Sequence, residues 1–256
     1  MYDGCEVRRV NVQNDLAVLA ARIRSATRLT ILTGAGVSAA SGVPTFRGQD
    51  GLWRQHRAED LATPEAFGRN PRLVWEWYAW RRETIAGCRP NAAHEVIAAW
   101  SQRAGSRTVT QNVDDLHARA GTERLVRLHG SIWELSCWDG CANGATPWRD
   151  ERVPLAEMPP RCPHCGGLAR PAVVWFGESL RGEDVRAALQ ATACDVFLTV
   201  GTSAIVYPAA GLVHEARRQG AFTAEINLAA TPASSGVDVA IHGGAETILP
   251  RVAELV

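Results

Sequence analysis

Four cysteines near the middle of the chain stand in two close pairs, which is the clearest sign of chemistry in this sequence. Cys137 and Cys141 enclose three residues, and Cys162 and Cys165 enclose two. Four thiolates are soft ligands that suit a structural zinc ion in tetrahedral coordination. His164, inside the second pair, is an alternative ligand. A zinc ribbon that binds nucleic acid is the competing interpretation, but this segment lacks the basic stripe that such binding needs.

A glycine-rich turn at residues 34–38 directly follows the apolar run Arg28–Thr33, and a helix is expected to begin within it. Glycine lets the backbone approach a pyrophosphate, and a helix amino terminus offers unpaired N–H groups to anions. A tight strand-to-helix turn that binds no ligand would have the same sequence pattern, and it is the alternative interpretation. In dehydrogenases, a second strand that ends in an acidic residue follows about 20 residues later, and this sequence has none there. A long loop carrying Phe46, Arg47 and Trp53 follows instead, and its composition is typical of a loop that closes over a cofactor.

Helix-length segments separate four apolar runs that each end in small or polar residues. The runs are Arg28–Thr33, Thr108–Thr110, Val196–Val200 and Phe222–Ile226. This pattern predicts an α/β fold, a Rossmann-like doubly wound parallel sheet with a ligand crevice at the carboxyl ends of its strands. Between residues 12 and 23, apolar residues recur at helical spacing, which predicts an amphipathic helix before the first strand.

Between residues 137 and 170 the apolar periodicity disappears and Pro, Gly, Cys and Trp dominate. We expect a small insert held by metal, because this segment has too little apolar surface for its own core. Residues 1–136 and 171–256 would form the Rossmann-like catalytic domain. The formal net charge is zero, which gives no electrostatic case for nucleic acid or acidic membranes. With clustered cysteines and no targeting segment, a cytoplasmic protein, most simply a monomer, is expected.

The segment Trp75–Glu83 is predicted to be helical. Tyr78 and Arg81 stand three residues apart and therefore share a helix face, whereas Arg82 points to another. A planar guanidinium binds a carboxylate through two hydrogen bonds, and a phenol can add one more. A solvated helix surface with no ligand is the alternative interpretation of this pair.

Six segments together resemble the motifs of the sirtuin family, in the same order and at similar spacing. They are GAGVSAASGVPTFRG, TQNVDDLHARAG, LHGSIWEL, PAVVWFGE, VGTSAIVYPAA and INLAATP, which span the chain from about Thr30 to Leu249. Six long motifs in order are far more specific than any one glycine pattern. The resemblance implies a large Rossmann-like domain and a small zinc-binding domain, with NAD and an acyl-lysine in the cleft between them.

The activity that the resemblance implies is NAD-dependent removal of acyl groups from the lysines of protein substrates, giving nicotinamide and O-acyl-ADP-ribose. Such a reaction needs a base near neutral pH. His129, in Leu128-His129-Gly130, matches the family's catalytic histidine, and its ordinary pKa of about 6.5 suits the task. An NAD hydrolase or ADP-ribosyltransferase on the same fold and a non-catalytic NAD sensor are the alternatives.

The same resemblance assigns the other site residues. The expected contacts with NAD are Gly34, Ala35, Gly36, Ser38, Phe46, Arg47, Trp53, Gln111, Asn112, Asp114, Gly201, Thr202, Ser203, Asn227, Leu228, Ala229 and Ala245. Asn112 and Asp114 could also cap the helix that follows them. The expected contacts with the substrate are Ala62, Tyr78, Arg81, Val174, Phe176, Gly177 and Tyr207.

Two groups of the predicted substrate contacts indicate how the substrate would bind. The segment from Val174 to Glu178 matches the one that binds the substrate backbone as an added strand, although an ordinary buried strand is the alternative. Val206, Tyr207 and Pro208 would face it across the groove. The class III sirtuins, which remove succinyl and malonyl groups, carry the pair matched by Tyr78 and Arg81 and a small residue matched by Ala62. Succinyl and malonyl groups are therefore expected substrates beside acetyl.

Overall fold

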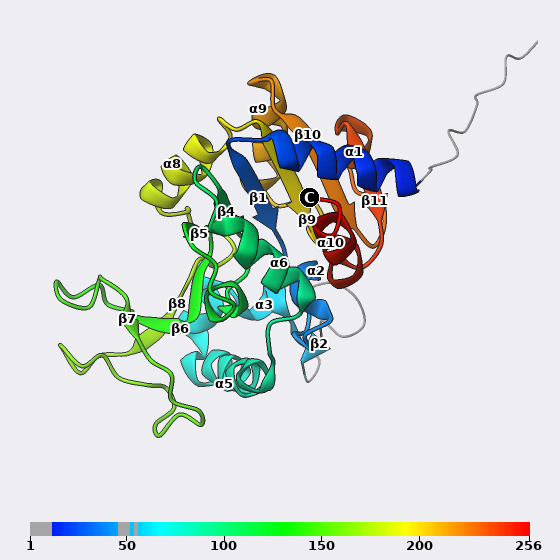
Figure 1. Cartoon of the computed structure of the whole chain (residues 1–256). Coiled ribbons are helices and arrows are strands. Elements are labelled where there is room, and N and C mark those ends of the chain that lie inside the picture. Colours follow the sequence, from blue (N-terminus) through cyan, green and yellow to red (C-terminus); the bar gives the residue numbers. More distant parts are fainter. Residues whose placement is uncertain (1–11, 46–51, 54–55) are drawn as a thin grey trace, which may run out of the picture.

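The computed structural model describes residues 12–45, 52–53 and 56–256, with only the backbone described at 52–53. Its main sheet has six strands in the order β11-β10-β9-β1-β4-β5, and every neighbouring pair is parallel (Figure 1). The strands are β1 (Leu29–Thr33), β4 (Arg107–Thr110), β5 (Leu125–Arg127), β9 (Val196–Val200), β10 (Phe222–Asn227) and β11 (Val239–His242). The predicted fold class is confirmed, and β5 and β11 are additions to the predicted strands.

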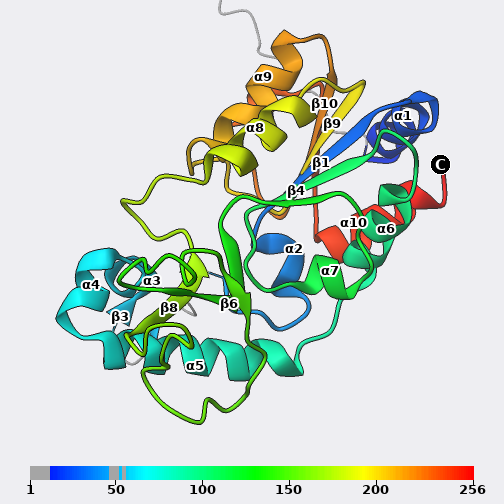
Figure 2. The same cartoon turned by 90° about the vertical axis from the view of Figure 1, so that its left-hand side faces the viewer.

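Helices cover both faces of this sheet, as Figure 2 shows. One face carries α1 (Val12–Ser25), α6 (Ala92–Ser101) and α10 (Ala245–Ala253), and the other carries α8 (Gly182–Ala191) and α9 (Leu212–Arg218). Within β1, Ile31 packs in the first of these layers and Leu32 in the second. A strand buried on both faces is apolar throughout, which explains the continuous apolar runs in the sequence.

The strand order reverses between β1 and β9. From β1 the chain builds outward through β4 and β5, and later it returns to build the other half through β9, β10 and β11. Thr33, the last residue of β1, is paired with Thr110 on one side and Val200 on the other. The turns after these three strands therefore meet at one edge of the sheet, which is where ligands bind in open α/β folds.

A second lobe is built on an antiparallel sheet of β7 (Trp148–Arg149), β6 (Gly130–Cys137) and β8 (Ala169–Val173). Helices α3 (Ala58–Leu61), α4 (Pro64–Arg69) and α5 (Pro71–Gly87) share an apolar core with it, including Phe67, Trp75 and Leu135 (Figure 2). The limits 137 and 170 of the expected insert remain a prediction. The core of this lobe, however, draws on helices outside that range.

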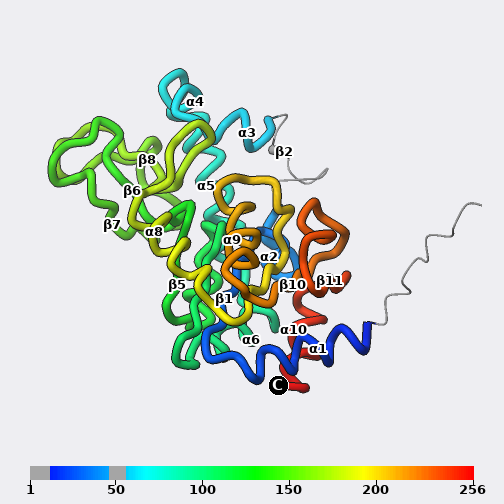
Figure 3. The backbone as a smooth tube through the Cα atoms, turned by 90° about the horizontal axis from the view of Figure 1, so that it is seen from above, coloured from blue at the N-terminus to red at the C-terminus, as the bar shows by residue number. Residues whose placement is uncertain are grey.

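Short elements complete the described chain. They are α2 (Gly36–Ala39), α7 (Leu116–Arg119), the 3-10 turns η2 (Ala209–Gly211) and η3 (Ser234–Gly236), and the paired β2 (Leu52–Trp53) and β3 (His56–Arg57). Viewed from above, the loops of the small lobe lie on the side far from α1 and α10 (Figure 3). Among the helices described, none is long and apolar enough to cross a membrane.

Ion pairs lie between the two lobes and within the small lobe. Asp115, buried beside α7, accepts hydrogen bonds from Arg127 of β5 at 2.6 Å and from Arg149 of β7 at 2.7 Å. Arg82 of α5 is fully buried and lies 2.9 Å from the Asp150 carboxylate. Arg82 therefore points away from the face of Tyr78 and Arg81, as predicted.

Candidate active site

A cavity of about 740 Å³ lies between the lobes, at the carboxyl edge of the main sheet. Residues from both lobes form its wall. From the sequence-predicted set it is lined by Gly34, Ala35, Gly36, Gln111, Asn112, His129, Gly201, Thr202, Ser203, Asn227, Ala62, Tyr78, Arg81, Val174, Phe176, Gly177 and Tyr207. All seven expected substrate contacts and most of the expected NAD contacts therefore share one cavity, although their roles stay predictions.

The turns after β1 and β9 are packed against each other so closely that both need glycine. A Cβ atom on Gly34 would lie 2.8 Å from the carbonyl oxygen of Gly201. Gly201 itself has a φ of +59°, and a Cβ there would lie 2.4 Å from the backbone nitrogen of Val37. These glycines expose bare backbone at the cavity wall, which is the surface a dinucleotide pyrophosphate requires.

The predicted free N–H groups at the start of the helix are largely occupied. The N–H of Gly36 donates to Gly201 at 2.8 Å, and those of Val37 and Ser38 donate to Gly34 and Ala35 at 3.1 Å each. Helix α2 has only four residues, so its first N–H groups close the turn itself. This part of the prediction is wrong for these three donors.

Ser38 and Asp114 lie beneath the cavity wall and not on it. The Ser38 hydroxyl donates to Asp114 at 2.7 Å and accepts from the Asn112 side-chain amide at 3.2 Å. The other carboxylate oxygen of Asp114 accepts the N–H of Leu116, the first residue of α7, at 2.9 Å, so Asp114 caps this helix from the position before its N-cap residue, Asp115. Burial raises the pKa of Asp114. Together these bonds hold the loop that presents Asn112 to the cavity.

His129 is the one histidine that lines the cavity in the part of the chain that the structure describes. Its Nδ1 lies 2.9 Å from the Gln111 carbonyl oxygen, which can only accept, so Nδ1 carries the proton and Nε2 keeps its lone pair. Burial lowers the pKa of His129, although its bond to Gln111 opposes the shift. The imidazole is therefore neutral at pH 7, the state that a base requires.

His94 of α6 and His117 of α7 belong to the core. Both are buried, and burial lowers the pKa of His94 to about 4 and that of His117 to about 3. Their ring centroids lie 4.9 Å apart, and His117 Nε2 lies 2.9 Å from the Thr33 hydroxyl. These two histidines are structural.

Tyr78 and Arg81 are buried side by side on α5, at 1% and 8% exposure, so a solvated helix face is ruled out. The Arg81 guanidinium lies 5.0 Å from the Trp77 ring centroid and 5.8 Å from that of Tyr78. Burial raises the pKa of Tyr78 to about 12, so the phenol keeps its proton at neutral pH. Burial lowers the pKa of Arg81, but a guanidinium stays charged in proteins. Ala62 lines the same cavity.

The segment after β8 lines the cavity but is not a strand, and it turns at Phe176 and Gly177. The Val174 N–H donates to the His129 carbonyl at 3.0 Å, and the Phe176 N–H donates to the Ala62 carbonyl at 2.9 Å. Phe176 is 46% exposed, and Tyr207, which also lines the cavity, is 74% exposed. The segment thus ties the loop of His129 to the loop of Ala62, and the cavity wall carries two exposed aromatic side chains.

Some predicted NAD contacts lie elsewhere. Leu228 is 71% exposed and Ala229 is exposed, because Asn227 bonds to the Ala229 carbonyl at 3.0 Å and the turn leads away from the cavity. Ala245 is buried at the start of α10. None of these three lines the cavity, whereas Asn227 does, and their contact with NAD remains a prediction. Phe46 and Arg47 lie outside the described residues, as does the side chain of Trp53.

Several residues of the cavity wall were not among the predicted contacts, although Trp175, Glu178, Val206 and Pro208 belong to the segments expected to border the substrate. The full set is Thr45, Glu59, Val113, Val173, Trp175, Glu178, Ser179, Leu180, Val185, Val206 and Pro208. Trp175, Glu178 and Pro208 stand inside or beside the quoted motifs, so these motifs were the signal that could have found them. Glu59 stands in no such motif and is brought to the cavity by α3.

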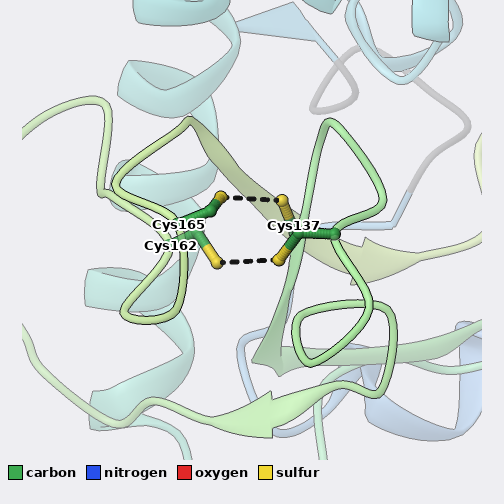
Figure 4. A group of neighbouring side chains, drawn as sticks. Cys137, Cys162 and Cys165 are labelled. Atoms are coloured by element: carbon green, nitrogen blue, oxygen red, sulfur yellow. Dashed lines mark hydrogen bonds between the residues drawn. The ribbon is translucent and has the colours of Figure 1, made fainter.

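The four clustered cysteines fit a zinc ion. Their sulfur atoms all lie within 4.8 Å of one another, at 3.6 Å between Cys137 and Cys165 and 3.8 Å between Cys141 and Cys162 (Figure 4). Zn–S bonds of about 2.3 Å in a tetrahedron place sulfur atoms about 3.8 Å apart. His164 is not part of this group, so four thiolates are the ligand set that the geometry favours.

Known proteins share this architecture. A model of the Sir2 family matches residues 34–208. NAD-dependent protein deacylase 2 of Pyrobaculum aerophilum is 48% identical over 234 residues, which cover 91% of this chain and 92% of its own. A Sir2 homologue in complex with NAD has a TM-score of 0.86 at 41% identity over 93% of each chain. A mutant Sir2 homologue in complex with 2′-O-acetyl-ADP-ribose has a TM-score of 0.86 at 40% identity, over 93% of this chain and 95% of its own.

The parallel sheet with its crevice at the strand switch, and the four-cysteine lobe across that crevice, define an enzyme that uses a dinucleotide between two lobes. The chain belongs to the Sir2 family: it is an NAD-dependent protein deacylase with a four-cysteine zinc site. The resemblance seen in the six motifs is thereby confirmed.

Proposed function

We propose that this deacylase favours lysine acyl groups that end in a carboxylate, such as succinyl and malonyl, over acetyl. It would transfer them to the ADP-ribose of NAD, so that nicotinamide leaves and, with water, free lysine and O-acyl-ADP-ribose are formed. The observation that carries the proposal is that Tyr78 and Arg81 line the same cavity as His129. A phenol and a guanidinium so deeply buried beside a catalytic cavity form a site for an anion inside it.

His129 would act as the base of the reaction. NAD, when bound, supplies the ribose carbon that receives the acyl oxygen and the hydroxyl group that loses a proton. The Nε2 of His129 has the free lone pair to take that proton, because Nδ1 donates to Gln111. Because Gly34, Gly36 and Gly201 have no side chains, the pyrophosphate could approach the backbone of these turns, and Asn112 would present its amide near the ribose.

The acyl chain would enter between His129 and α5. A carboxylate in a buried site attracts a guanidinium more strongly than it does in water, because the effective dielectric is lower. Ala62 leaves room for the longer chain, since its side chain is a single methyl group. An acetyl group is too short to reach Arg81 and would gain nothing from it.

Arg81→Met is expected to raise the KM for a succinyl-lysine peptide roughly ten- to a hundredfold, since a charge-assisted hydrogen bond contributes about 1.5–3 kcal/mol. The KM for the matching acetyl peptide should change much less. Tyr78→Phe should shift succinyl binding in the same direction by less. The measurement is steady-state kinetics of both peptides with saturating NAD.

Arg72→Met supplies a matched control, because Arg72 stands on the same helix with its side chain 72% exposed. This variant should leave both KM values near those of the wild type. An equal rise for both peptides in Arg81→Met would show that Arg81 serves the helix and not the acyl pocket. Mass spectrometry of the products should find O-acyl-ADP-ribose, whereas ADP-ribose alone would identify an NAD hydrolase.

The pH dependence follows from the lowered pKa of His129. A base with a lowered pKa stays neutral as the pH falls through 6.5, so kcat/KM for an acetyl peptide should hold there and decline only at more acidic pH. The acetyl peptide is chosen because its acyl group does not titrate. A decline that already begins above pH 6.5 would contradict the buried, neutral imidazole.

A further inference from the structure

Trp175 is buried against the acyl pocket, where its indole nitrogen lies beside the Tyr78 hydroxyl. It is 2% exposed and belongs to the cavity wall. The distance from Trp175 Nε1 to Tyr78 Oη is 2.9 Å. This contact involves neither His129 nor the four cysteines. Any effect that it has on the reaction must therefore act through Tyr78.

The chemistry of the two groups fixes the direction of this hydrogen bond. An indole N–H can only donate, so the Tyr78 oxygen is the acceptor. Burial raises the pKa of Tyr78 to about 12, so the phenol also retains its own proton. That proton must therefore be directed to some other acceptor, away from Trp175. A phenol that accepts one hydrogen bond also becomes a better donor in the next.

The indole is held firmly in this position. The Arg170 guanidinium lies 3.6 Å from the Trp175 ring centroid and donates to Glu178 at 2.8 Å. The Trp175 backbone N–H donates to the same carboxylate at 2.8 Å. On its other side the indole packs against Phe67, with ring centroids 5.3 Å apart. Because ring and backbone are both fixed, the N–H has little freedom to leave Tyr78.

We propose that Trp175 is a specificity-determining residue, whose indole N–H occupies the Tyr78 oxygen and so turns the Tyr78 hydroxyl proton toward the carboxylate of a succinyl or malonyl chain. Trp175 is thus a positioning residue that acts through Tyr78. The inference rests on the proposed preference for acidic acyl groups. It adds that the preference needs three side chains, Tyr78, Arg81 and Trp175.

The test is a double-mutant cycle on succinyl and acetyl peptides with Trp175→Phe, Tyr78→Phe and the combined variant. Trp175→Phe should raise the succinyl KM roughly three- to tenfold, with a smaller change in the acetyl KM and little change in kcat. The combined variant should be no worse for succinyl than Tyr78→Phe alone, because the N–H has lost the hydroxyl through which it acts.

A second replacement separates the N–H from the bulk of the ring. Benzothienylalanine at position 175 keeps the bicyclic shape but replaces N–H by sulfur, so it leaves no cavity and should still raise the succinyl KM. Trp100→Phe is the control, since Trp100 is buried in the main-sheet core with α1 and α10 and does not line the cavity. It should not change the ratio of succinyl to acetyl KM.

Three results would contradict the inference. It is overturned if the benzothienyl replacement leaves the succinyl KM at the wild-type value, or if the effects of Trp175→Phe and Tyr78→Phe simply add. It is also overturned if succinyl and acetyl KM rise equally in the benzothienyl protein. In these cases the response of Arg81→Met still decides the proposed function separately.

Discussion

His129→Ala is expected to slow deacylation by roughly two to four orders of magnitude, the usual contribution of a positioned general base. The methyl group cannot take a proton, and no other histidine lines the cavity within the described residues. The rate should be measured in single turnover with saturating NAD and peptide, so that product release does not hide the chemical step.

The same substitution should spare the fold and NAD binding. His129 is only partly exposed but is neutral, and among the described residues its side chain bonds to the Gln111 carbonyl alone. The backbone bond from Val174 to the His129 carbonyl does not depend on the side chain and should persist. Calorimetric titration with NAD should therefore give a Kd within a few-fold of the wild type.

His214→Ala is the matched control, because His214 is exposed on α9, away from the cavity. It should turn over at the wild-type rate. Near-wild-type turnover by His129→Ala would refute the assignment of the base. A parallel loss of NAD binding and thermal stability would instead assign His129 a structural role.

The sheet and the place of the site could be predicted because they follow from local rules. Apolar runs such as Val196–Val200 reveal strands buried on both faces, and the polar turns after them must converge at one edge. The edge strand β5 was harder to recognise, since all three of its residues are only half-buried. The other edge strand, β11, has four residues of mixed burial and carries a similarly weak signal.

The sequence could not predict toward which side of a turn each side chain points. Asn112 and Asp114 stand two residues apart in one motif, yet Asn112 lines the cavity and Asp114 caps α7 beneath it. Likewise the core of the small lobe joins Phe67 to Trp138, whose rings are 4.8 Å apart although 71 positions separate them in the sequence. Such contacts depend on tertiary packing that no periodicity records.

Removal of zinc should unfold the small lobe and abolish activity together. Structural zinc in small sites contributes about 10–16 kcal/mol of binding free energy, as much as a whole domain's stability of about 5–15 kcal/mol. In this lobe Trp138, next to Cys137, packs on Phe67, and Phe67 packs on Trp175 of the acyl pocket. Disorder that begins at the cysteines is therefore expected to reach the cavity wall.

Cys162→Ser, or a strong chelator, should lower the Tm and the deacylation rate in parallel, and elemental analysis of the wild type should give one zinc per chain. Cys88→Ser is the matched control. Cys88 lies outside the cluster, and its thiol contacts the Thr84 carbonyl at 3.3 Å, a bond that a serine hydroxyl can replace. Active wild-type protein without zinc would refute the metal site. A Cys162→Ser variant that loses zinc but keeps its Tm and rate would show that the lobe holds together through Phe67, Trp138 and Trp175 without the ion.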